Sequence, residues 1–457
     1  MDKLQLIEKL KNSKLAIIGA GRSGIAAAKL LKGKGLEVFV SDHGKLSLHA
    51  RQQLEALNIP WEEGMHSSKL DDCRILIVSP GVNPNHEFLR EVRKKDVEII
   101  TEIEIGWAWL QGKLVAITGT NGKSTTTALL GEILKAAKLG GEIGGNLAPG
   151  KPLSELANQS QPHKWICAEV SSFQMELVKY FKPDAVIWTN LSPDHLDRHK
   201  DINEYAELKM DLVNRTSDSG FVVLNGDDPI ISKLTEKLDK QKLYFGHNEH
   251  PQFYSFLDDQ GIIFIPDIII PYSDIQLRGE HNFENIMAAG TAALKIGVNP
   301  DELKQGIRNF SGLPHRLEIV GEVEGVTFIN NSMCTNEAAF ERSLETFPHS
   351  TVIAGGHPKN TDLYRIAEIL NDLASQVVLL GKSSSELAKH LNNLGKTYKI
   401  AEDIDQAVYI SFQLSNKGEV VLLNPGMASF DLFIDFLDRG DKFKQAVSNL
   451  RRTVNCA

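Results

Sequence analysis

Residues 114–134, LVAITGTNGKSTTTALLGEIL, decide the fold of this chain. An apolar, β-branched run, Leu114–Thr118, leads into a glycine-rich loop, and the loop leads into an apolar segment that starts at Lys123. A strand, a phosphate-type loop and a helix in this order belong to strand–helix–strand units around a parallel sheet. The stretch therefore predicts an α/β fold with a phosphate-binding loop inside it.

The loop Gly119–Ser124 has the residues of a shortened P-loop. Backbone N–H groups would surround a phosphate, Lys123 would neutralise it, and Ser124 would hold Mg²⁺. The full eight-residue pattern requires glycine at position 117, where this chain has Ile117. The alternative is a solvated turn that happens to contain Gly-Lys-Ser, but the flanking strand and helix favour the phosphate site.

Outward from this loop, short apolar runs alternate with longer amphipathic stretches through all 457 residues. This alternation is typical of parallel sheets covered by helices. The chain is too long for a single core of ordinary size. We predict an α/β protein of three domains, 1–101, 102–312 and 313–457.

A second glycine loop lies near the start of the chain, where Gly19, Gly21 and Gly24 follow the run KLAII. Asp42 ends the next apolar run, VFVSD. This G-x-G-x-x-G spacing brings backbone N–H groups to a phosphate at a helix N-terminus and places a carboxylate near a ribose or base. A dinucleotide site and a tight turn without ligand are both compatible with the motif.

Composition excludes several classes of protein. A formal net charge of −9 argues against nucleic acid as a partner. No apolar run approaches the roughly 20 residues of a membrane span, so we expect a soluble, untargeted, cytoplasmic monomer. The four cysteines are scattered without disulfide or zinc spacing: Cys73, Cys167, Cys334 and Cys456.

Four motifs taken together resemble the Mur ligase family across essentially the whole chain. They are TGTNGKST from Thr118, GGN from Gly144, EVSSFQ from Glu169 and TNLSPDHLDRH from Thr189. The resemblance implies an ATP- and Mg²⁺-dependent ligase that adds D-glutamate to UDP-N-acetylmuramoyl-L-alanine through an acyl phosphate, for peptidoglycan precursor synthesis. It also implies that the first, Rossmann-like domain holds UDP, with candidate contacts from Gly19, Arg22, Ser23, Asp42 and Gly81.

The resemblance assigns roles in the central domain residue by residue. It implies catalytic roles for Lys123, Asn146, His195 and Lys209, and metal contacts from Ser124, Glu169, His195 and Lys209, the last as a carbamate. For His195 a core histidine is the alternative, for Lys209 a surface lysine, and for Asn285 a helix-capping or turn residue. The implied ATP contacts are Gly119, Thr120, Asn121, Gly122, Lys123, Ser124, Thr125, Asn285 and Arg316.

The third domain departs from the family pattern. Where the family has N-D-S-K-A-T-N, this chain has Asn331 in place of the aspartate and Met333 in place of the lysine. Pro358 and Asn360 likewise replace an aspartate and a glycine. Because one buried charge without its partner is costly, the first two changes suggest coordinated substitution. The residues implied to contact D-glutamate remain: Thr335, Lys359, Ser429 and Phe436.

Three other functions remain open on the sequence alone. The same chemistry could use another amino acid, such as L-glutamate. A non-catalytic Mur-like protein could bind the UDP-sugar peptide or nucleotide, although it would not need the set of metal-binding residues. A dinucleotide-dependent dehydrogenase would explain only the first domain.

Overall fold

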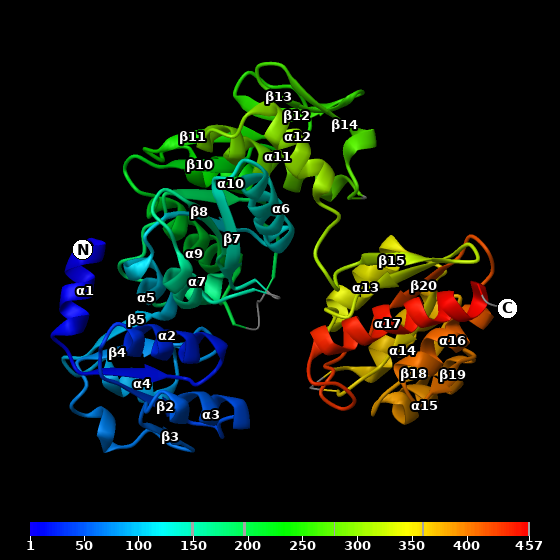
Figure 1. Cartoon of the computed structure of the whole chain (residues 1–457), viewed down its shortest axis with the longest axis horizontal. Helices are drawn as coiled ribbons and strands as arrows, with labels where there is room; N and C mark the ends of the chain where they lie inside the picture. The colour runs from blue at the N-terminus through cyan, green and yellow to red at the C-terminus, as the bar shows by residue number, and fades with distance from the viewer. Residues whose placement is uncertain (148–149, 195–197, 278, 359–360, 456–457) are drawn as a thin grey trace. The chain divides into compact units, whose positions relative to one another are not determined.

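The computed structural model describes the chain except residues 148–149, 195–197, 278, 359–360 and 456–457. The chain divides into two compact units, 1–310 and 311–457, and Figure 1 shows the elements of each. The first unit contains two sheets and the second contains one. The predicted three-domain α/β architecture is confirmed, while the bounds at residues 101 and 312 stay a prediction.

The first sheet has five parallel strands in the order β3-β2-β1-β4-β5. The chain leaves β1 toward β2 and later returns to the other side of β1 at β4, so the carboxyl ends of β1 and β4 form a topological switch point, where ligands bind in open α/β sheets. The strands are β1 (Leu15–Ile18), β2 (Val38–Asp42), β3 (Trp61–Glu63), β4 (Ile75–Val78) and β5 (Glu98–Thr101). The helices are α1 (Lys3–Lys11), α2 (Arg22–Gly33), α3 (Leu48–Ala56) and α4 (Glu87–Val92).

The second sheet has nine strands in the order β14-β13-β12-β11-β10-β9-β6-β8-β7, antiparallel only at the β12–β14 end. Its strands are β6 (Lys113–Thr118), β7 (Gly140–Gly145), β8 (Trp165–Glu169), β9 (Ala185–Trp188), β10 (Phe221–Asn225), β11 (Gln241–Phe245), β12 (Phe253–Asp258), β13 (Gly261–Phe264) and β14 (Ile268–Pro271). Its helices are α5 (Glu102–Trp109), α6 (Lys123–Ala136), α7 (Leu153–Gln159), α8 (Ser172–Met175), α9 (Ile202–Asn214), α10 (Pro229–Thr235), α11 (Glu280–Ile296) and α12 (Pro300–Asn309).

The strands at the centre of these sheets are apolar because helices cover both of their faces. All four residues of β1 and five of the six residues of β6 are buried. Parallel strands buried in this way read as continuous apolar runs, which is why the sequence located them. The central strands therefore hold the two glycine loops on rigid supports.

Helix α5 joins the two sheets of the first unit through buried carboxylates. Glu104 accepts hydrogen bonds from the backbone of Lys179 and Tyr180, and Glu102 accepts one from the backbone of Ser154. Burial raises the pKa of both carboxyl groups. One apolar core extends from the first sheet to the second. The site described below can therefore draw on both sheets.

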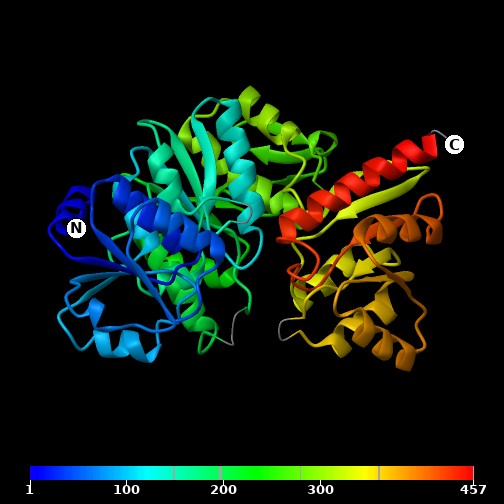
Figure 2. The same ribbon diagram turned by 60° about the horizontal axis from the view of Figure 1, so that its bottom comes forward.

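The second unit has a six-stranded sheet in the order β15-β16-β20-β17-β18-β19. Its strands are β15 (Glu318–Val323), β16 (Val326–Asn330), β17 (Thr351–Ala354), β18 (Gln376–Leu380), β19 (Lys399–Ala401) and β20 (Val420–Leu423). Its helices are α13 (Glu337–Thr346), α14 (Leu363–Leu373), α15 (Ser384–Leu394), α16 (Ile404–Leu414) and α17 (Phe436–Asn455). The long α17 runs beside β15 (Figures 1 and 2).

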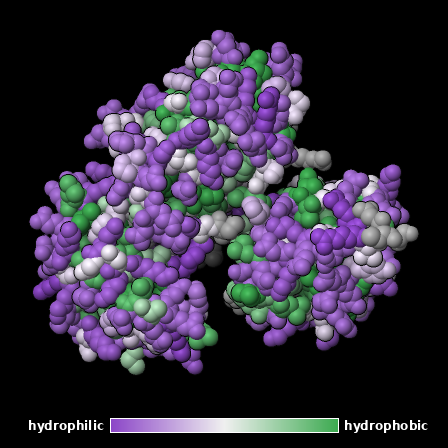
Figure 3. Space-filling view, in the orientation of Figure 1, coloured by the Kyte–Doolittle hydropathy of each residue, from purple (hydrophilic) through white to green (hydrophobic). Residues whose placement is uncertain are grey.

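Hydrophilic side chains dominate the face of each unit that Figure 3 shows. Within the part of the chain that the structure describes, no helix combines the length and apolar character needed to cross a membrane.

Candidate active site

The loop between β6 and α6 has a backbone that favours glycine at two positions. Gly119 has φ +147° and Gly122 has φ +77°. A Cβ atom at Gly119 would lie 2.0 Å from Thr189 Oγ1, and one at Gly122 would lie 2.1 Å from Asn285 Oδ1. The 14-residue helix α6 begins directly after this loop, so its first N–H groups form an anion-binding end.

The segment after β9 holds the first half of this loop. The N–H of Thr120 donates to the carbonyl of Asn190 at 3.0 Å, and its hydroxyl donates to the carbonyl of Ser192 at 3.0 Å. The N–H of Asn121 donates to Asn190 Oδ1 at 2.8 Å. The segment TNLS, 189–192, therefore supports the glycine loop, a relationship that the spacing of the two motifs does not reveal.

Lys123 folds back over the loop that it follows. Its ammonium donates to the carbonyls of Gly119 and Thr120, at 3.1 and 2.7 Å. These two contacts hold a positive charge above the backbone that would receive a phosphate. The position fits a lysine that neutralises phosphate.

Ser124, Glu169 and Asn146 form a polar cluster between α6, β8 and the end of β7, in which Ser124 and Glu169 are buried and Asn146 is exposed. The hydroxyl of Ser124 donates to Glu169 Oε2 at 2.6 Å, and the amide of Asn146 donates to Glu169 Oε1 at 3.1 Å. Only 4% of Glu169 is exposed. The structure thus brings together three predicted site residues that lie up to 45 positions apart in the sequence.

Lys209 is a buried lysine rather than a surface lysine, with 1% of the residue exposed. It comes from α9, and its ammonium donates to the carbonyl of Gly119 at 2.9 Å and lies 4.2 Å from the centroid of the Tyr205 ring. Burial, with the charge of Lys123 nearby, lowers the pKa of Lys209 well below its usual value, and Asp194 and Glu169 oppose this shift. The sequence alternative of a surface lysine is therefore wrong.

Asn285 lies on α11 against the same loop, with 3% of the residue exposed. Its Oδ1 accepts a hydrogen bond from Thr126 at 3.1 Å, and its Nδ2 donates to Asn282 Oδ1 at 3.1 Å. The alternative of an N-terminal helix cap does not fit, because Gly279 precedes α11. The proximity of Asn285 to the loop is established, whereas its contact with ATP stays a prediction.

The oxygen atoms of this cluster fit a hard cation. The Ser124 hydroxyl and the Glu169 carboxylate are ligand types that Mg²⁺ favours. Among the described residues there is no group of three His, Cys, Asp or Glu side chains that could hold a metal. Two protein oxygens suffice when phosphates and water complete the shell, as they usually do around Mg²⁺. The predicted ligand His195 lies outside the described residues.

A cavity of about 590 Å³ opens at the switch point of the first sheet. It is lined by all five residues predicted to bind UDP, namely Gly19, Arg22, Ser23, Asp42 and Gly81, and also by Asn146. The cavity therefore continues from the first sheet to the Glu169 cluster of the second. An extended ligand can reach from one glycine loop toward the other within this unit.

Two charged residues shape the cavity through backbone contacts. The carboxylate of Asp42 accepts hydrogen bonds from the N–H of Ala20 at 2.6 Å and of Gly44 at 2.7 Å. The guanidinium of Arg22 donates to the carbonyls of Gly150 and Leu147, at 3.1 and 3.2 Å. Asp42 thus fixes the first glycine loop, and Arg22 ties α2 to the second sheet.

Three histidines that sequence reasoning did not single out also line this cavity: His43, His66 and His86. They follow β2, β3 and β4 in turn. No local pattern joins residues 20 or more positions apart, so only the parallel order of these strands could have indicated that they meet.

In the second unit, the residues implied to bind D-glutamate lie on three neighbouring segments. Thr335 is exposed, Ser429 is buried, and Phe436 is half-buried at the start of α17. Lys359 lies outside the described residues. The approach of this unit to the ATP loop stays a prediction.

Asn331 and Met333 have different surroundings. The amide of Asn331 donates to Ser343 Oγ at 2.8 Å and to Asn424 Oδ1 at 2.9 Å, and its oxygen accepts from the N–H of Leu317 at 3.2 Å. Met333 instead receives the guanidinium of Arg316 at its sulfur. Asn424 provides the amide oxygen that accepts a hydrogen bond from Asn331.

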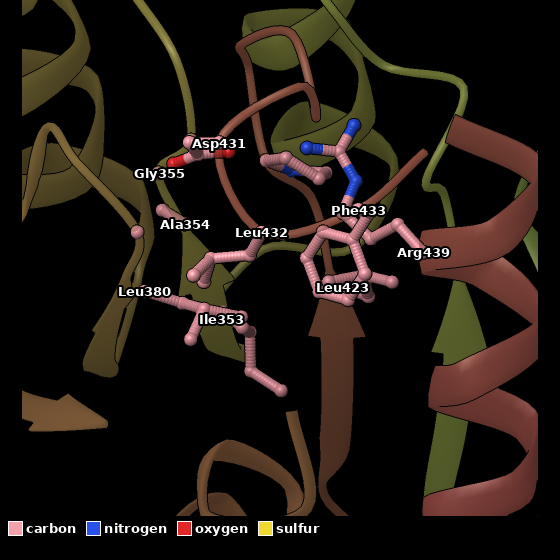
Figure 4. A pocket seen from close by; sticks show the side chains of 12 residues that line it. Ile353, Ala354, Gly355, Leu380, Leu423, Asp431, Leu432, Phe433 and Arg439 are labelled. Atoms are coloured by element: carbon pink, nitrogen blue, oxygen red, sulfur yellow. The ribbon is translucent and has the colours of Figure 1, made fainter. Parts of the chain in front are cut away.

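Figure 4 shows a small cavity at the carboxyl ends of β17, β18 and β20, bordered by Asp431 and Arg439. Its volume is about 10 Å³, which is room for one water molecule and not for an amino acid. This cavity therefore gives no support to an amino-acid site, and the predicted contacts of Thr335, Ser429 and Phe436 with D-glutamate stay a prediction.

Family models match three successive parts of the chain. Residues 14–88 match the MurD N-terminal domain, residues 117–293 the Mur ligase middle domain, and residues 315–426 the Mur ligase, glutamate ligase domain. Solved structures share the fold. One is a UDP-N-acetylmuramate-alanine ligase of Thermotoga maritima, with 19% sequence identity and a TM-score of 0.59. The match covers 96% of this chain and 100% of that chain. A MurF ligase of the same organism, in complex with ADP, has 17% identity and a TM-score of 0.54, with 90% of this chain and 95% of that chain covered.

Relatives of higher identity extend over the full length. A protein of Alkaliphilus metalliredigens is 34% identical over 457 residues, with 97% of this chain and all of the relative covered. A protein of Pelotomaculum thermopropionicum is also 34% identical, with 98% and 100% covered. Both are named UDP-N-acetylmuramoylalanine--D-glutamate ligase. The resemblance inferred from four motifs is confirmed, and the chain belongs to the Mur ligase family of ATP-dependent, amide-bond-forming ligases.

Proposed function

We propose that the protein joins D-glutamate to UDP-N-acetylmuramoyl-L-alanine, with cleavage of ATP to ADP and phosphate, in the cytoplasmic synthesis of peptidoglycan precursors. The observation that carries this proposal is the full-length, 34% identity to relatives of that name. We further propose that the enzyme acts as a monomer, because nothing in the reaction requires a second copy.

In this proposal the UDP group occupies the cavity beside Gly19, Arg22, Ser23, Asp42 and Gly81. The cavity also reaches Asn146, which supports placing the alanyl carboxylate near the Glu169 cluster. Substrate and nucleotide would then approach each other within one compact unit.

The proposed reaction has two steps. An oxygen of the alanyl carboxylate attacks the γ-phosphorus of ATP, and the bond to ADP breaks. The amine of D-glutamate then attacks the acyl carbon, phosphate leaves, and the amine loses a proton. Both steps bring negative groups together, so they need positive charge and oriented N–H donors.

The loop Gly119–Ser124 supplies those groups in the proposal, together with Thr125. Backbone N–H groups at the start of α6 bind the phosphates, and Lys123 neutralises them. Ser124 and Glu169 would hold Mg²⁺, which supplies charge compensation when it is bound. His195 would serve a second metal, while Asn285 and Arg316 would hold the adenosine end of ATP.

Lys209 has a separate role in the proposal. Its amine would attack CO₂ and lose a proton, which gives an anionic carbamate. The position of Lys209 beside Glu169 and the glycine loop supports this role, because a carbamate there would lie next to the proposed metal site. Burial also lowers the pKa of Lys209, which favours the neutral amine that attacks CO₂.

Product formation tests the proposed function. Purified protein would be incubated with ATP, Mg²⁺ and UDP-N-acetylmuramoyl-L-alanine, and with D- or L-glutamate in parallel. We expect phosphate release that requires both the UDP substrate and D-glutamate, and a product heavier by one glutamyl residue. A preference for L-glutamate would change the amino acid and keep the ligase. Binding without phosphate release would identify a non-catalytic member of the family.

A further inference from the structure

Three imidazole rings meet at the mouth of the cavity in the first sheet. The ring centroids of His43 and His86 lie 5.6 Å apart, those of His43 and His66 lie 6.1 Å apart, and those of His66 and His86 lie 6.2 Å apart. All three residues line the cavity. The rings form a cluster that spans the loops after β2, β3 and β4 and shares a cavity with the glycine loop of β1.

The cavity has few other groups that could balance the charge of a diphosphate. Among the described residues that line it, Arg22 is the only arginine or lysine, and its guanidinium already donates to two carbonyls. Asp42 adds a negative charge at the same wall. The N–H groups at the start of α2 add only partial positive charge, so the imidazoles that line the cavity are the groups able to supply a further full charge.

The hydrogen bonds of His66 show where it can accept a proton. The Ser41 hydroxyl donates to Glu62 Oε1 at 2.8 Å and also lies 2.8 Å from His66 Nδ1. Since a carboxylate only accepts and is the stronger acceptor, we assign the serine proton to Glu62 and the imidazole proton to Nδ1, which then donates to Ser41. The other nitrogen, Nε2, is then the basic one. The Glu62–Ser41 pair behind the ring stabilises the protonated form.

His86 has the opposite arrangement. Its Nδ1 accepts a hydrogen bond from the N–H of Phe88 at 3.3 Å and so caps α4. In this state Nε2 carries the proton and can already donate to a ligand.

We propose that His66 takes up one proton when the diphosphate of the UDP substrate binds, while His86 donates a hydrogen bond from Nε2, so that this cavity binds the diphosphate more tightly as the pH falls toward 6. The inference rests on the proposed function, since it takes the UDP-linked substrate as the ligand.

The direction of the effect follows from the groups that face His66. Burial, followed by repulsion from His86 and His43, lowers the pKa of His66 in the free protein, while Asp42 and Glu62 oppose the shift. A bound diphosphate adds negative charge and raises that pKa. Between the free and bound pKa values the free protein is neutral at His66 and the complex is protonated. Binding therefore consumes a proton and strengthens as pH falls.

Calorimetric titration of the full-length protein with UDP-N-acetylmuramoyl-L-alanine between about pH 8 and about pH 6 tests the inference. The diphosphate of this ligand is esterified at both ends, so it does not itself titrate in this range. One linked proton changes the Kd by up to about tenfold per pH unit, so we expect the Kd to fall several-fold toward pH 6. Titrations in buffers of different ionisation enthalpy should give an uptake of close to one proton.

Variants assign the proton. His66→Gln should remove most of the pH dependence of the Kd. His86→Gln should weaken binding at every pH but leave the pH dependence of the Kd unchanged. His49, an exposed histidine on α3 outside the cavity, provides the control variant His49→Gln, which should behave as the unmodified protein. Thermal unfolding of each variant verifies that it is folded.

Each other outcome has a definite meaning. A Kd that is constant from pH 8 to pH 6, or a slope that survives His66→Gln, overturns the inference while leaving the substrate assignment intact. A slope of the same size with uridine, which has no phosphate, also overturns it. Absence of binding at every pH refutes the UDP substrate, and the proton linkage with it.

Discussion

The guanidinium of Arg316 lies against the sulfur of Met333, with Nε and Nη2 each 3.4 Å from Sδ. Position 333 carries a lysine in the family pattern, so an apolar, polarisable side chain here accepts the arginine where a cation would repel it. The replacement of lysine by Met333 therefore corresponds to a contact within the second unit, the one between Arg316 and the Met333 sulfur.

Met333→Lys is expected to lower kcat/KM about tenfold. A second positive charge close to Arg316, at a partly buried site, costs roughly 1 to 4 kcal/mol, so the arginine should leave its position. Measurement of kcat/KM for ATP tests this expectation, and Met333→Leu, which removes the sulfur without adding charge, is the matched control. Equal losses in both variants would mean that the sulfur contact matters and charge does not.

The same site gives a coupling test with Asn331. The two side chains bind different partners, but Asn331 accepts from Leu317, the neighbour of Arg316, so both changes act on one short segment. Asn331→Asp would also direct a carboxylate at Asn424 Oδ1. If the two substitutions arose together, Asn331→Asp combined with Met333→Lys should recover more activity than the sum of the single effects predicts. Strict additivity would contradict coordinated substitution.

Lys123→Ala should lower turnover by about a thousandfold, because an oriented positive charge on the phosphates is lost. Binding of UDP-N-acetylmuramoyl-L-alanine should change by less than about twofold, since its cavity lies on the first sheet. Steady-state kinetics and calorimetry measure the two effects separately. Lys135→Ala, at the far end of α6 and paired only weakly with Glu132 at the surface, is the control. Unimpaired turnover would remove this loop from the mechanism.

The fold was predictable where burial makes the sequence simple, and less so elsewhere. The central strands β1 and β6 are continuous apolar runs, and the sequence located both of them. The edge strand β3 was missed because its three residues, WEE, are half-buried and carry charge. The strand β7 was missed because its sequence, GGEIGG, has glycine at four of six positions, which disfavours strands.

Within the candidate site, sequence reasoning succeeded where residues belong to one motif and failed where the fold joins distant ones. The loop Gly119–Ser124 was found because it joins an apolar strand to an apolar helix, and Glu169 was found through the motif EVSSFQ of the family resemblance. The histidine cluster was not found, because its members meet only through the order of three parallel strands. Arg439 was missed for a related reason, since nothing in its local sequence indicates that a charged residue with 1% exposure holds two loops together.

Lys209→Ala is expected to be nearly inactive and to regain part of its activity with added formate or acetate. A free carboxylate could enter the space left by the side chain and replace an anionic metal ligand. Lys209→Met, which fills that space, should be inactive without rescue. Activity is measured against carboxylate concentration for both variants, with Lys123→Ala in parallel. Full activity of Lys209→Ala without any addition, or equal rescue of all three variants, would refute a carbamate at this position.

The final prediction concerns Arg439, which joins the segments proposed to bind the amino acid. Its Nη2 donates to the carbonyl of Ser332 at 2.8 Å and to that of Met427 at 3.1 Å, and its Nε donates to the Ser332 hydroxyl at 3.0 Å. That hydroxyl donates in turn to the carbonyl of Phe436 at 2.7 Å. Burial lowers the pKa of Arg439 to about 10, so the guanidinium remains charged at neutral pH. One side chain thus fixes the loops before Thr335 and Ser429 and the start of α17.

Arg439→Lys keeps the charge but cannot reach both carbonyls and the hydroxyl, because an ammonium lacks the planar fork of a guanidinium. An acceptor left without a donor costs about 1 to 3 kcal/mol, so the free energy of unfolding of the second unit should fall by roughly 3 kcal/mol. If Arg439 also positions the amino-acid site, the KM for D-glutamate should rise at least about tenfold while the KM values for ATP and the UDP substrate stay within about twofold. Denaturant unfolding and steady-state kinetics below the unfolding transition measure both effects, with Arg452→Lys in the last turn of the same helix as the control. A loss of stability with all three KM values unchanged would leave Arg439 a structural residue only, because loosened loops would then still hold Thr335, Ser429 and Phe436 in place.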